Sequence, residues 1–401
     1  MNFLLSDDKL GSLDKMESNL SLSAGGLYVH IPFCRKKCLY CDFYSVGERK
    51  ADWHRFVDAL LLELQSRAEE LPHTLKTIYF GGGTPSLMPS DEFRRLCEAL
   101  APLADDVVEF TLEANPDDVT VEKLSLWKEC GVDRLSIGLQ SFNDDVLKAI
   151  GRRHTSDEAR NACLLAGDFF QNISIDLIFG LPGQSVRIWE KDVEEAVRLH
   201  PQHISCYSLM YEPGTPITFL RDKGNIDELS ESDSEKMYDV LVNSLQEAGF
   251  DHYEISNFAL PGYRSIHNSS YWHQYPYLGI GPSAHSYDGL RCRSANKPDL
   301  CSYVNFWNAK DLIYGKDNNI LVREILSDTE LKEEYIMTSL RIREGISIND
   351  FRGRFGSEAA ETLIEKCRKW IDDGSLVSDN GRIFIAENSL LISDSIIVDL
   401  I

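Results

Sequence analysis

Six short apolar runs rich in β-branched residues alternate with helical patterns along the first half of the chain, and this alternation constrains the fold more than any other feature. The apolar runs cover residues 27–31, 76–80, 107–113, 134–140, 173–179 and 203–209. The helical patterns between them cover residues 52–71, 90–101, 121–130, 144–150 with 156–168, and 186–199. Strand and helix repeated in this way predict a parallel sheet, which right-handed crossovers wind into a barrel or partial barrel. We therefore predict an α/β fold with a partial, TIM-like (β/α)6 barrel.

The second half of the chain has a different pattern. A helix at 233–248 and a strand at 250–256 are expected to extend the sheet. Three helical segments (328–342, 346–356 and 358–372) then precede two short strands joined by Asn-Gly, which predicts a small winged-helix-like α+β module. The expected division is a flexible N-terminal lead (1–25), a core barrel (26–256), a loop-rich linking region (257–327) and a C-terminal module (328–401).

Charge and hydropathy argue against several classes of protein. No run approaches the roughly 18 apolar residues of a membrane span, and the first 25 residues lack the basic start and apolar stretch of a signal peptide. We therefore expect a cytoplasmic protein. The net charge of −23 repels a phosphate backbone, so we expect no nucleic-acid partner. The mixed charge of residues 348–370 also disfavours a DNA-binding regulator, and we interpret this segment as a substrate lid or docking surface.

Polar candidates gather at the carboxyl ends of the predicted strands. Cysteines follow the first strand, GGGTPS (81–86) follows the second, Glu113 ends the third, Gln140 ends the fourth and Asp176 lies in the fifth. Barrel active sites are built at that face. Because the motifs of five successive strands agree on one face, the sequence predicts an active or binding site there.

Three of the cysteines, Cys34, Cys38 and Cys41, lie within eight residues of the sequence. A structural zinc site normally takes four protein ligands, whereas a 4Fe-4S cluster offers four iron corners. Three thiolates would hold three irons and leave the fourth open to another ligand, so we favour the cluster over zinc or a core role. The other cysteines are expected to be small buried hydrophobes in a reducing compartment: Cys97, Cys130, Cys163, Cys206, Cys292, Cys301 and Cys367.

The pattern CxxxCxxC after the first strand resembles the radical S-adenosylmethionine (SAM) superfamily. Other segments are similar to its branch of oxygen-independent coproporphyrinogen III oxidase-like proteins, HemN and HemW, over about residues 26–390: YVHIPFC (28–34), FGGGTPS (80–86), LEANPDD (112–118), RLSIGLQSFND (134–144), GRRHT (151–155) and IDLIFGLPGQ (175–184). In that superfamily the open iron chelates the amino and carboxylate groups of SAM, and an electron from the cluster splits SAM into methionine and a 5′-deoxyadenosyl radical. The resemblance thus implies a 4Fe-4S cluster and SAM as cofactors, and a reduced flavodoxin or ferredoxin-type electron donor.

The resemblance also implies which residues hold these cofactors. The three cysteines of CxxxCxxC carry the cluster, and the GGGT segment matches the site for the SAM amino group, where glycines let the backbone approach a ligand. A tight turn is the alternative for these glycines, and an ordinary surface residue is the alternative for Glu113, whose carboxylate suits ribose hydroxyls. Gln140, Arg152 and Asp176 match residues that face a second SAM or substrate. The full set is Tyr28, Tyr40, Gly82, Gly83, Thr84, Glu113, Gln140, Arg152 and Asp176.

Two features separate the haem chaperones of this branch from its oxidases. The oxidases carry a fourth cysteine in CxxxCxxCxC, whereas this chain has Phe43 at that position. HNSSYW (267–272) resembles the HNxxYW motif of the HemW type, which is linked to haem binding. Imidazole is a common axial haem ligand, and Tyr and Trp pack on porphyrin faces. The expected haem residues are His267, Asn268, Tyr271 and Trp272; His273 and His285 are weaker candidates, and a core histidine is the alternative for His267.

The resemblance therefore implies a HemW-like haem chaperone, which binds haem, the cluster and SAM and delivers haem to respiratory haem proteins. SAM cleavage and a homodimer are further expectations. The alternative is an oxygen-independent coproporphyrinogen III oxidase, which converts two propionates into vinyl groups, and Phe43 disfavours it. A third option is a radical SAM enzyme that opens or methylates the porphyrin ring.

Overall fold

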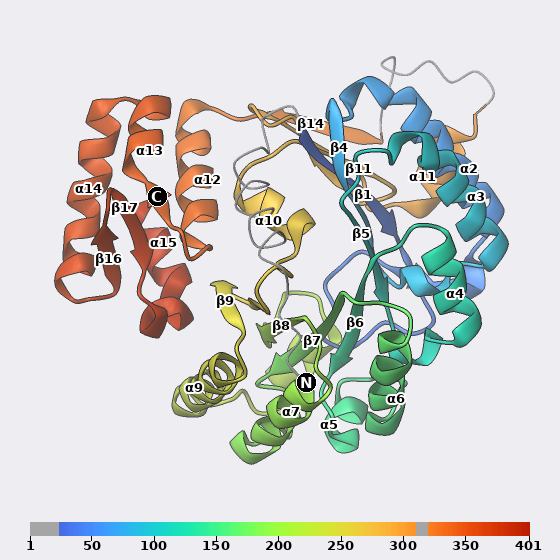
Figure 1. Ribbon diagram of the computed structural model, residues 1–401, viewed down its shortest axis with the longest axis horizontal. Coiled ribbons are helices and arrows are strands. Elements are labelled where there is room, and N and C mark those ends of the chain that lie inside the picture. The colour runs from blue at the N-terminus through green and yellow to red at the C-terminus, as the bar shows by residue number, and fades with distance from the viewer. Residues whose placement is uncertain (1–23, 310–319) are drawn as a thin grey trace, which may run out of the picture.

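One large mixed sheet organises most of the chain (Figure 1). The computed structural model describes residues 24–309 and 320–401, so the expected N-terminal lead lies almost entirely outside the described residues. The strands follow the order β14-β13-β12-β11-β1-β4-β5-β6-β7-β8-β10-β9. Neighbouring strands from β11 to β8 pair in parallel, and the strands beyond either end pair antiparallel.

The predicted alternation of strands and helices is confirmed. The six predicted strands are β1 (Ala24–Ile31), β4 (Thr74–Gly82), β5 (Glu109–Ala114), β6 (Arg134–Gln140), β7 (Ile173–Phe179) and β8 (His203–Ser208). The helices between them are α2 (Trp53–Ser66), α3 (Ser90–Leu100), α4 (Val121–Glu129), α5 (Asp144–Ala149), α6 (Ser156–Gly167) and α7 (Val186–Arg198). Local capping sets their starts: Thr155 and Glu158, for example, form a capping box at α6. These helices lie outside the strands in Figure 1, as a partial barrel requires.

Alternate side chains of the parallel strands form the apolar core against the helices, such as Leu135, Ile137 and Leu139 of β6, while the residues between them face the interior of the barrel. Trp127 of α4 and Trp189 of α7 are fully buried in this core. The Trp189 indole donates to the Met237 carbonyl of α9 (Glu231–Glu247), 2.8 Å away, so α9 packs beside α7. No helix among the described residues is long and apolar enough to cross a membrane.

The segment that we expected to be rich in loops contains strands and helices. These are β10 (Asn257–Ala259), α10 (Ile266–Trp272), β11 (Tyr277–Ile280), β12 (His285–Tyr287), β13 (Cys292–Asn296), α11 (Leu300–Trp307) and β14 (Leu321–Ile325). The expectation of a loop-rich region overlooked these strands because they have only three to five residues, too few to show an apolar period, and several of them bury polar side chains. Buried Ser286 and Asn296, for example, bond Arg67 and Glu63 beside α2 rather than apolar neighbours. The division of the chain at 257 and 327 stays a prediction.

The C-terminal residues form a small module with its own apolar core. Its elements are α12 (Asp328–Leu340), β15 (Ile346–Ser347), α13 (Ile348–Phe355), α14 (Ser357–Asp372), β16 (Leu376–Asp379), β17 (Arg382–Ile385) and α15 (Ser393–Leu400). Asn380 and Gly381 both have positive φ, as a two-residue type I′ hairpin requires. The predicted helices and hairpin are present, and α15 is an addition that the sequence pattern did not indicate. In Figure 1 the module lies on the side of the sheet marked by α10 and β9 (Asp251–Glu254).

Candidate functional site

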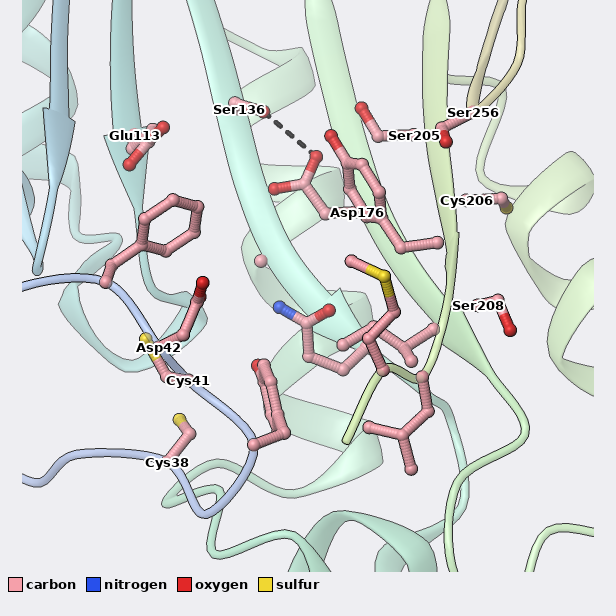
Figure 2. Close-up of a pocket in the computed structure, with 18 of the residues that line it drawn as sticks. Cys38, Cys41, Asp42, Glu113, Ser136, Asp176, Ser205, Cys206, Ser208 and Ser256 are labelled. Atoms are coloured by element: carbon pink, nitrogen blue, oxygen red, sulfur yellow. Dashed lines mark hydrogen bonds between the residues drawn. The ribbon is translucent and has the colours of Figure 1, made fainter. Parts of the chain in front are cut away.

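A cavity of about 650 Å³ lies inside the partial barrel, between the cysteine loop, the strand ends and the C-terminal module (Figure 2). Alternate residues of β6 line it, from Arg134 at the start of the strand to Gln140 at its end. Six residues of strand cover about 20 Å, so the cavity runs along the barrel. The module contributes residues of η6 (Glu387–Ile392) and of α15 to the wall. Most predicted cofactor residues line this cavity: Cys34, Cys38, Tyr40, Cys41, Gly82, Gly83, Thr84, Glu113, Gln140, Arg152 and Asp176.

The cysteine loop is held at both ends and in the middle. Two short strands, β2 (Phe33–Cys34) and β3 (Val46–Gly47), pair in parallel and join its ends. The Leu39 backbone N–H donates to the Ile150 carbonyl, 3.1 Å away, and the Leu39 carbonyl accepts from the Ile217 N–H at 3.0 Å. The three thiols are free and half-buried. A loop fixed in this way presents all three sulfurs to one cavity.

The donor set fits a 4Fe-4S cluster better than a single metal ion. Among residues 24–309 and 320–401, no three His, Cys, Asp or Glu side chains are gathered as they would be around one ion. A cubane cluster requires a wider spacing between the three cysteine sulfurs than a single ion does, because each thiolate binds its own iron. Thr84 Oγ1 donates to Cys34 Sγ at 3.4 Å, and Arg152 Nη1 donates to Cys38 Sγ at 3.4 Å. The bond from Thr84 lowers the pKa of Cys34 and so favours the thiolate form that a cluster requires.

Burial opposes ionisation of the thiols in the absence of a metal. It raises the pKa of the Cys34 thiol, and it raises the pKa of Cys41 to about 11. Metal binding releases these protons and thereby couples to folding. Cys34 and Cys41 are therefore disfavoured as free thiolates, and a bound cation would offset the cost of their ionisation.

The glycines after β4 are required by the backbone itself. Gly82 has a φ of 110° and its backbone N–H donates to Glu113 Oε2 at 3.1 Å. The Gly83 N–H donates to the Ile31 carbonyl at 2.8 Å, and a Cβ on Gly83 would lie 2.8 Å from the Phe33 carbonyl oxygen. The positive φ of Gly82 and the close approach of Gly83 to the start of the cysteine loop explain both glycines without a ligand. Their role in binding SAM stays a prediction.

Glu113 lies in the cavity wall with both carboxylate oxygens bonded. Oε1 accepts from the Tyr79 hydroxyl at 2.9 Å, and Oε2 accepts from the Gly82 N–H. Burial, with a contribution from the nearby Asp176 charge, raises the pKa of Glu113 to about 7. Glu113 is therefore an acceptor whose charge changes near neutral pH.

Arg152 connects the cysteine loop to the ends of β5 and β6. Its Nη2 donates to Asn115 Oδ1 at 2.8 Å and to the Gly138 carbonyl, while Nη1 reaches Cys38. Gln140 has a φ of 72°, a left-handed conformation that is uncommon for a residue with a side chain. Asp176 accepts from Ser136 at 3.1 Å, and burial raises the pKa of Asp176. The three residues expected beside a second ligand thus share one cavity (Figure 2 shows Asp176 and Ser136).

His267 does not reach the cavity. Its side chain is buried, with the residue 1% exposed; Nδ1 bonds Thr77 Oγ1 at 2.7 Å and Nε2 bonds the Tyr271 hydroxyl at 2.8 Å. The ring stacks on Tyr79 with centroids 4.9 Å apart, and burial lowers the pKa of His267 to about 3. Both ring nitrogens are therefore occupied in this structure. Axial ligation of haem by His267 would require the loss of one of these bonds, and it stays a prediction.

The other predicted haem residues are divided. Asn268 lines the cavity, whereas Tyr271 and Trp272 do not. The Arg341 guanidinium lies 4.7 Å from the Trp272 ring centroid, so Trp272 packs at the junction with the module. Tyr28, expected near SAM, also lies behind the wall, where its hydroxyl bonds His30 Nδ1 at 3.2 Å. The weaker candidates His273 and His285 are both exposed and do not line the cavity.

Known proteins match this chain along most of its length. The Radical SAM superfamily profile matches residues 28–196, and the HemN C-terminal domain profile matches residues 326–391. The protein named heme chaperone HemW of Bacillus subtilis (strain 168) is 33% identical over 376 residues, which cover 92% of this chain and 97% of that protein. This chain belongs to the HemW family of radical SAM proteins.

Other relatives agree with membership of the HemW family. The heme chaperone HemW of Synechocystis is 35% identical over 383 residues, covering 89% of this chain and 88% of that protein. The mitochondrial radical S-adenosyl methionine domain-containing protein 1 of Bos taurus is 35% identical over 330 residues, covering 80% of this chain and 74% of that protein. The solved structure of coproporphyrinogen III oxidase (HemN) of Escherichia coli aligns with a TM-score of 0.79 at 21% identity, over 99% of this chain and 93% of that one. HemW-family and HemN chains therefore share one fold, as predicted.

Several cavity residues were missed by sequence reasoning. Arg134 and Ser136 precede Gln140 on the same face of β6, so the strand period of two was the signal that could have found them. Asn115 follows Glu113, within the LEANPDD segment that resembles the family. Ser205 and Arg341 had no such signal, because neither lies in a motif. Their place in this HemW-family site depends on how distant segments pack.

Proposed function

We propose that this member of the HemW family is a haem chaperone that binds haem, a 4Fe-4S cluster and SAM and passes haem to respiratory haem proteins. The observation that carries the proposal is Phe43. This residue stands two positions after Cys41, lines the cavity and is 64% exposed, with its carbonyl accepting from Lys37 Nζ at 2.8 Å. A phenyl ring can neither ligate iron nor transfer a proton. The cavity mouth thus lacks the fourth thiol that the oxidases resembling this chain rely on.

The cysteine loop and the strand ends would hold the two cofactors. Cys34, Cys38 and Cys41 would carry the cluster, which together with SAM supplies reductive SAM cleavage when bound. Thr84 and Arg152 hold the thiols by hydrogen bonds, and Glu113 offers an acceptor for ribose hydroxyls. An electron donor of the flavodoxin or ferredoxin type, a cytoplasmic location and a homodimer complete the proposal, with no nucleic-acid partner.

The family relation supports haem as the cargo, since relatives across most of the chain are named heme chaperones. Asn268 of HNSSYW lines the same cavity as the three cysteines, which supports a haem site close to the proposed cluster. We propose that haem enters this cavity beside α10. His267 and Tyr271 would then act either as ligands after rearrangement or by holding α10 against β4.

The test is a haem titration with a matched pair of histidine variants. Anaerobically reconstituted protein is titrated with haem, and the Soret band is recorded for wild type, His267→Ala and His273→Ala. We expect wild type and His273→Ala to bind haem equally, because His273 is exposed at the end of α10. His267→Ala is expected to weaken binding about tenfold or more, since it removes a buried ring with two hydrogen bonds. Wild type that shows no Soret shift would overturn the chaperone proposal.

The oxidase remains the second candidate, because the fold of this chain matches that of Escherichia coli HemN. Incubation with coproporphyrinogen III, SAM and a reductant distinguishes the two. We expect no vinyl product at any time point. Formation of a divinyl porphyrinogen would favour the oxidase over the haem chaperone.

A further inference from the structure

The floor of the barrel cavity carries a charged side chain that no step above uses. Arg134 is the first residue of β6, lines the cavity and is 1% exposed. The cysteines and Gln140 lie at the other end of the strand, about 20 Å away along β6. Arg134 therefore marks a second end of the cavity, away from the predicted cluster.

Arg134 has buried donors without partners. Its Nε and Nη1 atoms are fully buried and have no hydrogen-bond partner within the described part of the chain. A guanidinium stays charged in proteins, and an unpaired buried charge or N–H group is costly. Side chains in this state are frequently completed by a ligand.

The carboxylates close to Arg134 are committed to other donors. Both oxygens of Glu109 accept from the backbone N–H groups of Ile266 and His267, each at 2.9 Å. Glu113 accepts from Tyr79 and Gly82, and Asp176 accepts from Ser136. None of these carboxylates bonds the Nε or Nη1 atom of Arg134 in the described structure, although the Arg134 charge opposes the rise in the pKa of Glu113 and of Asp176.

Two hydroxyl groups lie at the same end, and both are hydrogen-bonded to Asp176. Ser136 is two residues beyond Arg134 on the same face of β6, and Ser205 lines the cavity from β8. Figure 2 shows Ser136 and Ser205 across the cavity from Cys38 and Cys41. Burial is the main cause of the low pKa of His267, and the charge of Arg134 is the second cause. Arg134 therefore also lies close to the HNSSYW motif.

We propose that Arg134 binds a carboxylate of the ligand that fills the barrel and, on the basis of the proposed haem function, that this carboxylate is a haem propionate. Guanidinium is planar and matches a carboxylate in geometry and charge. SAM also has a carboxylate, but the family resemblance implies that this group binds the open iron of the cluster beside the cysteines, at the other end of β6. Arg134 thereby orients haem with one propionate on the cavity floor.

The ligand-side test compares haem with haem dimethyl ester, in which both propionates are uncharged. The reconstituted, SAM-loaded protein is titrated with each probe and the Soret band gives the affinity. We expect wild type to bind haem about 10- to 100-fold more tightly than the ester. Because this comparison uses wild type only, it does not depend on the folding of a variant.

The protein-side test replaces the guanidinium. Arg134→Met is expected to bind both probes with affinities within about threefold of each other, close to the affinity of wild type for the ester. Arg134→Lys keeps a charge without the planar fork, and we expect it to retain part of the preference. The control is Arg94→Met, which removes the same charge from an exposed pair with Glu129 on the outer helices and should keep the full preference.

The outcomes separate this inference from the proposed function. Equal affinity of wild type for haem and ester would overturn the propionate site and leave the chaperone function standing. Failure of both probes to bind would overturn both proposals. If Arg134→Met weakens SAM binding and leaves the preference for haem over ester intact, the carboxylate belongs to SAM and the inference is wrong.

Discussion

At the residue scale, burial sets the protonation of the groups around the cavity. It raises the pKa of the carboxyls Glu113 and Asp176, and it lowers the pKa of His267. The His267 imidazole is therefore neutral at physiological pH, while Arg134 keeps its charge. The cavity is lined by several cationic side chains, among them Arg134, Arg152 and Arg341, and burial disfavours the charged form of its carboxyls Glu113 and Asp176, so it is suited to an anionic ligand.

Glu113 gives a prediction about stability and pH. Its folded pKa of about 7 lies above the usual value of a glutamate, so the folded state binds a proton more tightly than the unfolded state. The contribution of Glu113 to the free energy of unfolding is therefore full at low pH and is lost as pH rises from about 4.5 to 7. We expect the stability difference between wild type and Glu113→Gln to change by about 1–3 kcal/mol over that range. Anaerobic denaturant titrations at several pH values measure it, and parallel curves for the two proteins would contradict it.

At the element scale, the end of β4 supports the cysteine loop. The Gly83 N–H donates to the Ile31 carbonyl, and a Cβ on Gly83 would lie 2.8 Å from backbone atoms of Pro32 and Phe33, just before Cys34. Backbone contacts of the β4 end therefore help to position the cysteine loop. Thr84 then adds its hydrogen bond to Cys34 Sγ.

Gly83→Ala is expected to disturb this contact. The added Cβ would lie 2.8 Å from backbone atoms that cannot move independently, so we expect a loss of about 1–3 kcal/mol in stability and reduced iron incorporation. Gly47→Ala is the control, since a Cβ on Gly47 meets no atom within 4 Å in the same region. Thermal unfolding and iron content after reconstitution check the pair. Equal behaviour of the two variants would show that the contact is not required.

At the scale of the whole molecule, the C-terminal module completes the cavity. The Ile255 N–H donates to the Arg341 carbonyl at 3.1 Å, and the Arg343 N–H donates to the Tyr253 carbonyl at 3.0 Å. The backbone that follows α12 therefore pairs antiparallel with the end of β9. Leu390 and Asp394 of the module line the cavity. Movement of the module would therefore open or close one wall.

Arg264 holds the barrel and the module together. Its Nη2 pairs with Asp251 Oδ2 at 2.6 Å and its Nη1 with Glu344 Oε1 at 2.8 Å. We expect Arg264→Met to increase hydrogen exchange in residues 341–346 and 390–394, because partly buried ion pairs of Arg are among the stronger ones. Arg368→Met, which removes an exposed pair within α14, should leave exchange there unchanged. Unchanged exchange in Arg264→Met would show that the module is held mainly by apolar packing.

Patterns along the chain were enough to predict the six strands, their helices and the strand-end motifs, because periodicity, caps and spacing are local properties. The cysteine triplet and the GGGT segment could be placed on one face for the same reason. The short strands from β10 to β14 could not be found, because their pairing depends on partners such as β1 and on buried polar bonds to Glu63 and Arg67.

The roles of particular side chains depended on contacts between distant segments. HNSSYW was visible as a motif in the sequence. Its histidine, however, is hydrogen-bonded to Thr77, 190 residues earlier in the chain, and lies outside the cavity. Arg134 belongs to a recognised motif, yet its unpaired buried donors became visible only once β5, β6 and β7 were packed together. Local order thus follows from neighbouring residues, whereas the pairing state of each buried polar group follows from the tertiary packing that removes it from water.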